Sequence, residues 1–355
     1  MNRQIAETLT LRAGPEARAR IATDGVSADA FATLLGASGG PKWLILAGLD
    51  RQLMGDFFRD RNAPLALLGT SVGTWRHAMF AQRDPLSALD RFLAAYLAQR
   101  YSAQPTVAEL TAAAERLLGI LLGEHGARDI VDNRVFHTHI VAARCRGYAA
   151  HEARGPLLSA LALAAVLNIV SRRSLALHFE RILFASGDRS ALQLRGLPAR
   201  ETALTQDNVV DALLATAAVP MVFAPRRDIA GAPPGVYRDG GITDYHFDLD
   251  IDAPPGLVLY PHFYPHITPG WFDKLLRWRS PRGALRNRTL LVAPSPAFVA
   301  ALPGGAVPDR RDFARYDDLT RERFWRAAVD ESRRLGDAFA AWCRDPEPAR
   351  YLQPL

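Results

Sequence analysis

Short apolar runs alternate with helix-like segments along most of the chain, and this alternation is what most limits how the chain can fold. The apolar runs expected to form strands cover residues 30–36, 66–68, 135–143, 181–186, 191–194, 235–238, 257–260 and 289–293. Apolar residues at helical spacing predict helices over residues 43–58, 74–82, 85–99, 107–122, 208–218 and 319–343. This order predicts a three-layer α/β/α fold in which helices cover both faces of a mostly parallel sheet.

Two details of this arrangement can be specified further. The runs at 181–186 and 191–194 are joined through Gly187-Asp188, a connection typical of a β-hairpin. The 355 residues would allow two domains, but we expect one domain over residues 1–355. Its core is expected at about 28–295, with a helical insertion at about 99–133 and a C-terminal helix at about 319–343.

The composition is that of a globular protein, with 49% hydrophobic and 23% charged residues. Cys145 and Cys343 are the only cysteines, so a disulfide scaffold is excluded and a reducing compartment is expected. Residues 1–18 are polar and contain no apolar core of a secretory signal, which makes the cytoplasm the expected location. The longest apolar run, 157–170, is too short to span a bilayer and predicts a helix that is buried or at a membrane edge.

The net charge of +6 comes from 43 basic residues against 37 acidic ones. All but two of the basic residues are Arg and are spread along the chain; the exceptions are Lys42 and Lys274. A nucleic-acid interface would need a basic stripe with stacking aromatic residues, so no nucleic-acid partner is expected.

The sequence Gly69-Thr70-Ser71-Val72-Gly73 separates the predicted strand at 66–68 from the predicted helix at 74–82. It matches the pattern G-x-S-x-G, in which two glycines relieve crowding around a serine held in a strained turn between strand and helix. The context predicts Ser71 as a nucleophile. The alternative is an ordinary glycine-rich turn.

A serine hydroxyl needs a base to take its proton, and the sequence offers two answers. In a Ser-His-Asp esterase, Asp239 would orient a histidine that follows it in the chain. In a Ser-Asp dyad, Asp239 itself would accept the proton, because Gly240 and Gly241 beside it let the backbone approach another element closely. Neither arrangement needs a metal or a cofactor. The histidines that would fit the first arrangement are His246, His262 and His266.

Two further segments fit catalysis at Ser71. Residues 215–220 form a helix end, Ala-Thr-Ala-Ala-Val-Pro, that leads toward Asp239. The segment Ser38-Gly39-Gly40-Pro41-Lys42 offers amides at a helix start, where they would stabilise an oxyanion. Pro41 has no N–H. The expected donors are therefore Gly39, Gly40 and Val72.

Taken together, these four motifs resemble the patatin-like phospholipase family. The family has a glycine-rich oxyanion loop ending in a basic residue, then G-x-S-x-G, then A-[ST]-x-A-x-P, then D-G-G or D-G-A. This chain has all four in that order over residues 36–244, roughly 60% of its length. The family loop is usually richer in glycine and has Gly after the basic residue, where this chain has Trp43.

The resemblance implies a three-layer α/β/α fold and hydrolysis of acyl esters, typically of lipids, through a Ser-Asp dyad and an acyl-enzyme. It makes Ser71 the nucleophile and Asp239 the base. The partner it implies is a lipid or other acyl ester, with no cofactor. The remaining positions that match the family motifs are Gly39, Gly40 and Lys42 in the oxyanion loop, Gly69 and Gly73 around the serine, and Gly240 and Gly241 after the aspartate.

Residues 271–279 concentrate aromatic, aliphatic and basic side chains. If they form a helix, the apolar ones share one side of it. The segment predicts a peripheral membrane contact, with packing against the sheet or against another copy as the alternative. A catalytically idle scaffold or membrane-binding protein with the same fold also fits the sequence. The apolar members are Trp271, Phe272, Leu275, Leu276 and Trp278.

Overall fold

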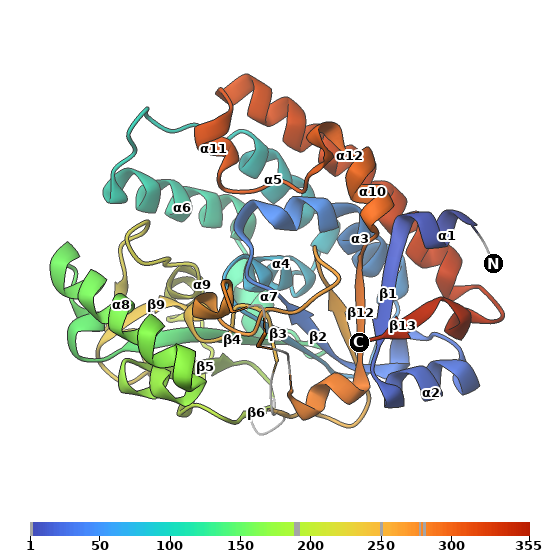
Figure 1. Cartoon of the computed structure of the whole chain (residues 1–355), viewed down its shortest axis with the longest axis horizontal. Coiled ribbons are helices and arrows are strands. Elements are labelled where there is room, and N and C mark those ends of the chain that lie inside the picture. The colour runs from blue at the N-terminus through green and yellow to red at the C-terminus, as the bar shows by residue number, and fades with distance from the viewer. Residues whose placement is uncertain (1–2, 188–191, 249–250, 277, 280–281) are drawn as a thin grey trace.

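One large sheet runs through the molecule, and helices cover both of its faces (Figure 1). It is seen in a computed structural model of the chain, which describes residues 3–187, 192–248, 251–276, 278–279 and 282–355. The strand order is β13-β1-β12-β11-β2-β3-β4-β5-β7, and β9 pairs with β4 and β8. The bounds are β1 Leu9–Ala13, β2 Phe31–Gly36, β3 Leu65–Gly69, β4 Phe136–Cys145, β5 Phe179–Ala185, β7 Ala199–Ala203, β8 Arg226–Arg227, β9 Val236–Asp239, β11 Leu257–Pro261, β12 Thr289–Pro294 and β13 Leu352–Pro354.

The middle of this sheet is parallel, as the alternation of strands and helices predicts. The strands β12, β11, β2, β3 and β4 pair in parallel with one another in that order. Antiparallel pairs occur toward the edges, where β1 joins β12 and where β4 joins β5 and β9. The predicted α/β fold with a mostly parallel central sheet is therefore confirmed.

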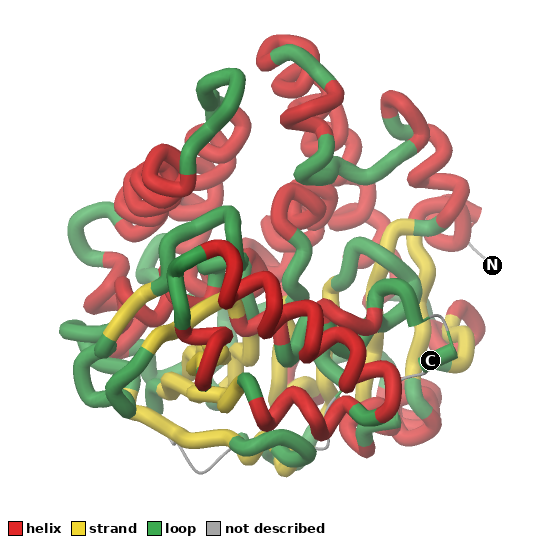
Figure 2. The backbone as a smooth tube through the Cα atoms, turned by 60° about the vertical axis from the view of Figure 1, so that its left-hand side comes forward, coloured by secondary structure: helices red, strands yellow, loops and turns green. Residues whose placement is uncertain are grey.

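The helices form a layer on each face of the sheet (Figures 1 and 2). The short helical turns that matter for the site are η2 Gly40–Leu46, η7 Gly240–Ile242 and η8 Trp271–Asp273. The α-helices are α1 Arg3–Thr8, α2 Pro15–Asp24, α3 Ala47–Gln52, α4 Val72–Phe80, α5 Pro85–Leu97, α6 Val107–Leu122, α7 Gly126–Asp132, α8 Arg154–Val170, α9 Val209–Thr216, α10 Pro296–Ala301, α11 Asp312–Arg315 and α12 Asp318–Cys343.

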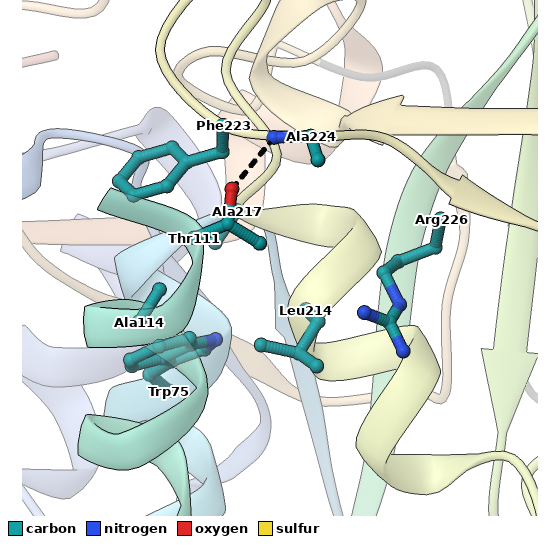
Figure 3. Close-up of a pocket in the computed structure, with 8 residues that line it drawn as sticks. All are labelled: Trp75, Thr111, Ala114, Leu214, Ala217, Phe223, Ala224 and Arg226. Atoms are coloured by element: carbon teal, nitrogen blue, oxygen red, sulfur yellow. Dashed lines mark hydrogen bonds between the residues drawn. The ribbon is translucent and has the colours of Figure 1, made fainter. Parts of the chain in front are cut away.

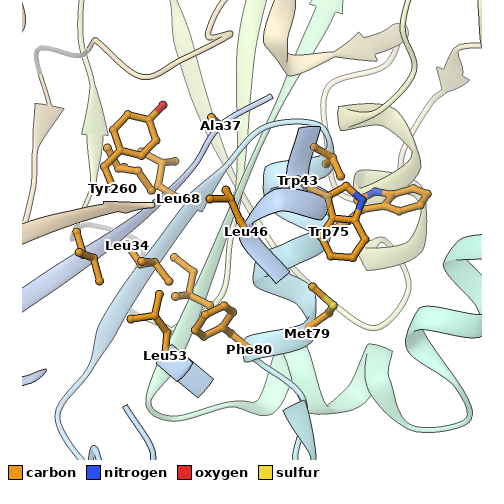
Figure 4. Packing of buried hydrophobic residues seen from close by; sticks show 14 of the residues in the cluster. Leu34, Ala37, Trp43, Leu46, Leu53, Leu68, Trp75, Met79, Phe80 and Tyr260 are labelled. Atoms are coloured by element: carbon orange, nitrogen blue, oxygen red, sulfur yellow. The ribbon is translucent and has the colours of Figure 1, made fainter. Parts of the chain in front are cut away.

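The main core lies between the central strands and the helices that follow β2 and β3 (Figure 4). Leu34 of β2 and Leu68 of β3 are fully buried in it. Trp43 of η2 stacks on Phe92 of α5, with their ring centroids 4.9 Å apart. Burying one such side chain stabilises a protein by roughly 1.5–3 kcal/mol. This packing fixes η2 and α4, the two elements that flank the candidate site.

Both chain ends contribute strands that the sequence analysis did not predict. β1 lies between β12 and β13, outside the expected core of 28–295. The Arg12 side chain of β1 donates hydrogen bonds to the carbonyls of Pro354 and Pro265, at 2.9 and 2.8 Å. Strands of five and three residues have no periodicity of their own to reveal them.

The predicted hairpin between 181–186 and 191–194 is wrong. β5 pairs with β4 on one edge and with β7 on the other, so neither edge is free for the residues after Gly187. Those residues form β6 (Gln193–Leu194), which pairs instead with β10 (Ile251–Asp252) in a separate two-stranded sheet. Residues 188–191, which include part of the predicted connection, lie outside the described residues.

Two predicted helices are replaced by other helical forms. Residues 43–58 are not one α-helix but the 3-10 turn η2, then α3, then a π-helical turn at Leu53–Phe57. Among the described residues of 271–279, the only helical turn is η8. The buried Asp273 carboxylate accepts hydrogen bonds from Asn168 and Arg279 that hold the segment in another shape. Arg277 lies outside the described residues.

The apolar run at 157–170 forms most of α8, which lies over the β4 and β5 end of the sheet (Figure 1). One side of α8 is buried and the other is exposed. Among the described residues, no helix combines the length and the apolar character needed to cross a bilayer.

Candidate functional site

The candidate site forms where two strands end beside β4. The first half of β4 pairs with β3, so that Gly69 lies opposite Ile140. Its second half pairs with β9, so that Asp239 lies opposite Ala142. Because β5 occupies the other edge of β4, the ends of β3 and β9 meet on one edge, two residues apart. The residues that follow or end these strands, Ser71 and Asp239, are thereby brought together.

Ser71 occupies a strained turn between β3 and α4. Its backbone has φ 52° and ψ −135°, a conformation that residues with a side chain seldom adopt. The turn needs close approach as well, because a Cβ on Gly73 would lie 2.2 Å from the carbonyl carbon and oxygen of Gly36. Gly69 is similarly packed against Thr74. The local geometry is that of the predicted strand, turn and helix around a serine.

The Ser71 hydroxyl donates a hydrogen bond directly to the Asp239 carboxylate, with Oγ and Oδ2 2.9 Å apart. Both side chains are buried, at 8% and 5% exposure. The other carboxylate oxygen, Oδ1, accepts a hydrogen bond from the Gly241 N–H at 2.6 Å. A Cβ on Gly240 would lie 2.0 Å from the Val141 carbonyl oxygen, so the turn after Asp239 can pass β4 only with glycine there.

Burial raises the pKa of Asp239 from 3.8 to about 6, because a carboxylate that has lost its water is less stable. Hydrogen bonds from the Gly241 N–H and the Ser71 hydroxyl act in the opposite direction, and so does the positive charge of Lys274. The carboxylate is thus mostly ionised at pH 7 yet more basic than an exposed aspartate. These are the properties that a general base needs.

Thr216, at the end of α9, links the two strand ends. Its hydroxyl oxygen accepts a hydrogen bond from the Ser71 N–H at 2.9 Å and donates one to the Val141 carbonyl at 2.6 Å. Two residues further on, the Ala218 carbonyl accepts the Asp239 N–H at 3.0 Å. The sequence pattern indicates this helix end but does not assign a role to Thr216. The hydroxyl in the third motif is what could have suggested one.

We expect Thr216→Val to destabilise the fold by about 1–3 kcal/mol, because it leaves a buried N–H and a buried carbonyl without a partner. Chemical unfolding measures this loss. Thr216→Ser keeps the hydroxyl and serves as the matched control. A valine variant as stable as the serine variant would show that the hydroxyl does not hold the turn.

The predicted oxyanion loop lies against the Ser71 turn. The hydroxyls of Ser38 and Thr70 are hydrogen-bonded at 2.9 Å, which fixes the loop to the residue before Ser71. Gly40 has φ +55°, a left-handed conformation that suits glycine. The N–H groups of the three predicted donors have no acceptor among the described residues, as a site for an anion requires. These donors are Gly39, Gly40 and Val72.

The only two lysines of the chain lie near this site in different states. Lys42 is buried and forms an ion pair with Asp309, so it fastens the loop to the segment before α11. Lys274 is exposed, and its Nζ lies 3.9 Å from the centre of the Tyr245 ring. No acidic side chain of the described residues forms an ion pair with it. Although the residue as a whole is exposed, its ammonium group lies against the Tyr245 ring, and the loss of water there lowers the pKa of Lys274 to about 8.

The three candidate histidines do not contact Ser71. His246 and His262 are buried, and burial lowers the pKa of both. The His246 Nδ1 accepts a hydrogen bond from the Thr268 N–H, so its proton is on Nε2. His266 stacks on Tyr264 with ring centroids 5.2 Å apart. None of them stands between Ser71 and Asp239.

A buried ion pair supports the turn after Asp239. Arg181 donates to both carboxylate oxygens of Asp244, at 2.7 and 2.8 Å, and both side chains are buried. Burial would raise the pKa of Asp244, but Arg181 and Arg172 lower it below its usual value. The Asp244 carbonyl also accepts the Thr70 hydroxyl at 2.8 Å. This pair therefore connects the turns at Ser71 and Asp239 to β5.

A small apolar pocket of about 20 Å³ lies one helical turn behind Ser71 (Figure 3). Trp75 of α4, Leu214 of α9 and Ala114 of α6 line it. This space fits about one water molecule, so it holds no acyl chain in this structure. A wider cavity of about 590 Å³ lies beside Lys274 and is lined partly by Thr268.

Within the described residues, no cluster of three or more His, Cys, Asp or Glu side chains is placed to hold a metal ion. No protein family matches this chain, and no curated protein matches it in sequence.

Proposed function

We propose that this protein is a serine acyl hydrolase of the patatin-like type that cleaves lipid acyl esters through Ser71 and Asp239. The observation that carries the proposal is the direct 2.9 Å hydrogen bond from the hydroxyl of a serine in a strained turn to a buried carboxylate. The order of the four sequence motifs and the free N–H groups of the Gly39-Gly40 loop also support it.

In the proposed reaction, the Ser71 Oγ attacks the ester carbonyl carbon while its proton passes to Asp239. The N–H groups of Gly39, Gly40 and Val72 stabilise the oxyanion. When the tetrahedral intermediate collapses, the bond to the alcohol breaks and Asp239 returns the proton to the leaving oxygen. Water then gives a proton to Asp239 and attacks the acyl-enzyme. When this second tetrahedral intermediate collapses, the bond between the acyl carbon and the Ser71 Oγ breaks, Asp239 returns the proton to Oγ, and the acid is released.

Direct contact between Ser71 and Asp239 favours this dyad over a Ser-His-Asp esterase, because a triad places an imidazole between the serine and the acid. A catalytically idle scaffold is disfavoured by the strain at Ser71 and by the burial of Asp239. Both cost stability, and proteins tend to retain such features where they serve function. We also propose a cytoplasmic location, which the free cysteines Cys145 and Cys343 fit.

The test is hydrolysis of a panel of esters by the wild-type protein and by Ser71→Ala. The panel holds soluble 4-nitrophenyl esters of increasing acyl length and dispersed glycerolipids, with and without charged head groups. We expect the wild type to hydrolyse lipid acyl esters and the variant to be inactive on all of them. Equal rates for the two proteins would overturn the proposal.

The pH dependence gives a second test. Hydrolysis requires ionised Asp239, so kcat/KM for a soluble ester is expected to rise with pH through a midpoint near 6. Lys274→Gln removes a positive charge that favours the ionised carboxylate, and this midpoint should move to higher pH. Lys274→Arg keeps the charge and should not move it. A midpoint near 4, or no difference between the two variants, would contradict this assignment.

A further inference from the structure

The outer side of α8 is an unusual surface for a helix of a globular protein. Residues 155–171 contain no charged side chain. The inner side, with Leu157, Leu161 and Ala164, is buried over the sheet. The outer side would normally be polar, but its exposed residues are largely aliphatic too. The large ones are Leu158, Leu163, Val166, Ile169 and Val170, which are 44%, 50%, 61%, 52% and 87% exposed.

This surface continues beyond the C-terminal end of α8. Leu177, Leu275 and Trp278 are 66%, 87% and 69% exposed. With the five residues of α8 they make up eight of the thirteen large apolar side chains exposed in the described part of the chain, so the exposed apolar residues are concentrated here. We call these eight residues the α8 surface. Figure 1 places α8 at the edge of the molecule, and Figure 2 turns that side forward.

The α8 surface is held in place by buried polar contacts. Asn168 of α8 donates to the Asp273 carboxylate at 2.7 Å, and Arg279 donates to the same carboxylate at 2.8 Å. Arg279 also donates to the Asn168 carbonyl at 2.7 Å. These contacts join the segment that carries Leu275 and Trp278 to the end of α8. The exposed apolar side chains therefore belong to a built structure.

The charges around the α8 surface are positive. Arg154 at the start of α8 and Arg173 just after its end are exposed, and no acidic side chain of the described residues pairs with either of them. Glu152, the nearest acidic residue in sequence to Arg154, pairs with Arg227. An apolar helix face flanked by free arginines complements a lipid surface with anionic head groups.

A second copy of the chain fits this surface less well. If two α8 helices packed antiparallel across a twofold axis, Arg154 of one would face Arg173 of the other. If they packed parallel, each arginine would face its own counterpart. Either arrangement brings like charges together at both ends of the contact, which disfavours association.

We propose that the α8 surface lies in the interfacial region of a membrane that contains anionic lipids. Its C-terminal end is next to the candidate site, because Arg172 donates to the Thr243 carbonyl and η8 packs beside η7, which begins directly after Asp239. A bound membrane would therefore lie beside Ser71 and Asp239. Of the eight residues of the α8 surface, five belong to α8 itself and two, Leu275 and Trp278, belong to the 271–279 segment. The inference rests on the surface itself and does not require that the protein be a hydrolase.

The test is sedimentation with vesicles of phosphatidylcholine alone and of phosphatidylcholine mixed with phosphatidylglycerol, using Ser71→Ala protein so that no lipid is consumed. We expect binding to the mixed vesicles that weakens with added salt. The double variant Val166→Gln/Ile169→Gln should lower the partition coefficient about tenfold or more. Ile120→Gln, which changes a similarly exposed residue on α6, should leave it unchanged. Arg154→Gln/Arg173→Gln should reduce binding to the mixed vesicles only.

Two results would overturn the membrane proposal. One is a folded Ser71→Ala protein, otherwise unchanged, that stays in the supernatant with both kinds of vesicle. The other is binding that the double variant leaves unchanged. Sedimentation equilibrium without lipid tests the alternative, in which a second copy of the chain covers the α8 surface. In that case the protein would be a dimer, and Val166→Gln/Ile169→Gln would dissociate it whereas Ile120→Gln would not. Because neither measurement involves ester hydrolysis, failure here leaves the proposed activity to its own test.

Discussion

Asp239→Asn is expected to lower kcat for ester hydrolysis by roughly 10²- to 10⁴-fold, because an amide cannot accept the proton of Ser71. The same change is expected to stabilise the fold. In the native protein the pKa of Asp239 is about 6, against 3.8 for an exposed aspartate, so the folded state disfavours the charged form. Ionisation of Asp239 therefore lowers the free energy of unfolding as the pH rises from 3.8 to 6, and this loss of stability is fully present above pH 6. Asparagine carries no charge and avoids it.

At pH 8 we therefore expect Asp239→Asn to unfold at a higher denaturant concentration than the wild type, by on the order of 1–3 kcal/mol in the free energy of unfolding. The gain should vanish below about pH 4, where the wild-type side chain is protonated in both states. Activity lost with stability gained separates a catalytic carboxylate from a structural one. A variant that is both inactive and less stable would indicate that Asp239 chiefly holds the fold.

The histidines supply the comparison for this result. Single changes of His246, His262 and His266 to Gln should each leave most of the activity of the folded protein, since none of the three contacts Ser71 or Asp239. If one of these variants folds normally and loses as much activity as Ser71→Ala, the protein uses a histidine and the dyad proposal fails.

The second large effect is expected at the ion pair behind the site. Asp244→Ala leaves the Arg181 guanidinium buried without its carboxylate, and breaking such a pair from one side costs about 3–5 kcal/mol. The pKa of Asp244 is lowered in the folded protein. The stability that its carboxylate contributes is therefore present above the ordinary aspartate value of 3.8 and is lost as the pH falls from there through the lowered value of the folded state. Wild type and variant should therefore approach each other in stability at acid pH.

Chemical unfolding at several pH values measures this difference. Glu152→Ala is the matched control, because it breaks the exposed pair between Glu152 and Arg227, where a loss of at most about 1 kcal/mol is expected. If Asp244→Ala costs no more than Glu152→Ala at neutral pH, the buried pair does not support the fold as described.

The sequence predicted the parts of the fold that depend on local patterns. Alternating apolar runs and helical spacing identified the central strands and α4 to α6, and the G-x-S-x-G pattern placed Ser71 between β3 and α4. The approach of Asp239 to Ser71 was expected because Gly240 and Gly241 relieve crowding after the aspartate, and both residues are packed as that argument requires.

The features that the sequence did not predict depend on partners far away in the chain. β13 exists only because β1 offers it an edge, and the expected hairpin fails because β7 occupies the edge of β5. Asp273 overrides the helical spacing of its own segment through its contact with Asn168, more than a hundred residues earlier. Contacts between residues far apart in the chain produce no periodic pattern of apolar residues, so they are seen only in the three-dimensional structure.

The most direct test of the account is labelling with a fluorophosphonate, which forms a covalent bond only with an activated serine. The reaction is followed by intact-protein mass spectrometry and located by peptide mapping, with Ser71→Ala and Asp239→Asn beside the wild type. We predict one adduct per chain, on Ser71, absent in Ser71→Ala and formed far more slowly in Asp239→Asn. A folded wild-type protein that takes up no label, or takes it up on a different serine, would contradict the claim that Ser71 and Asp239 form a catalytic dyad.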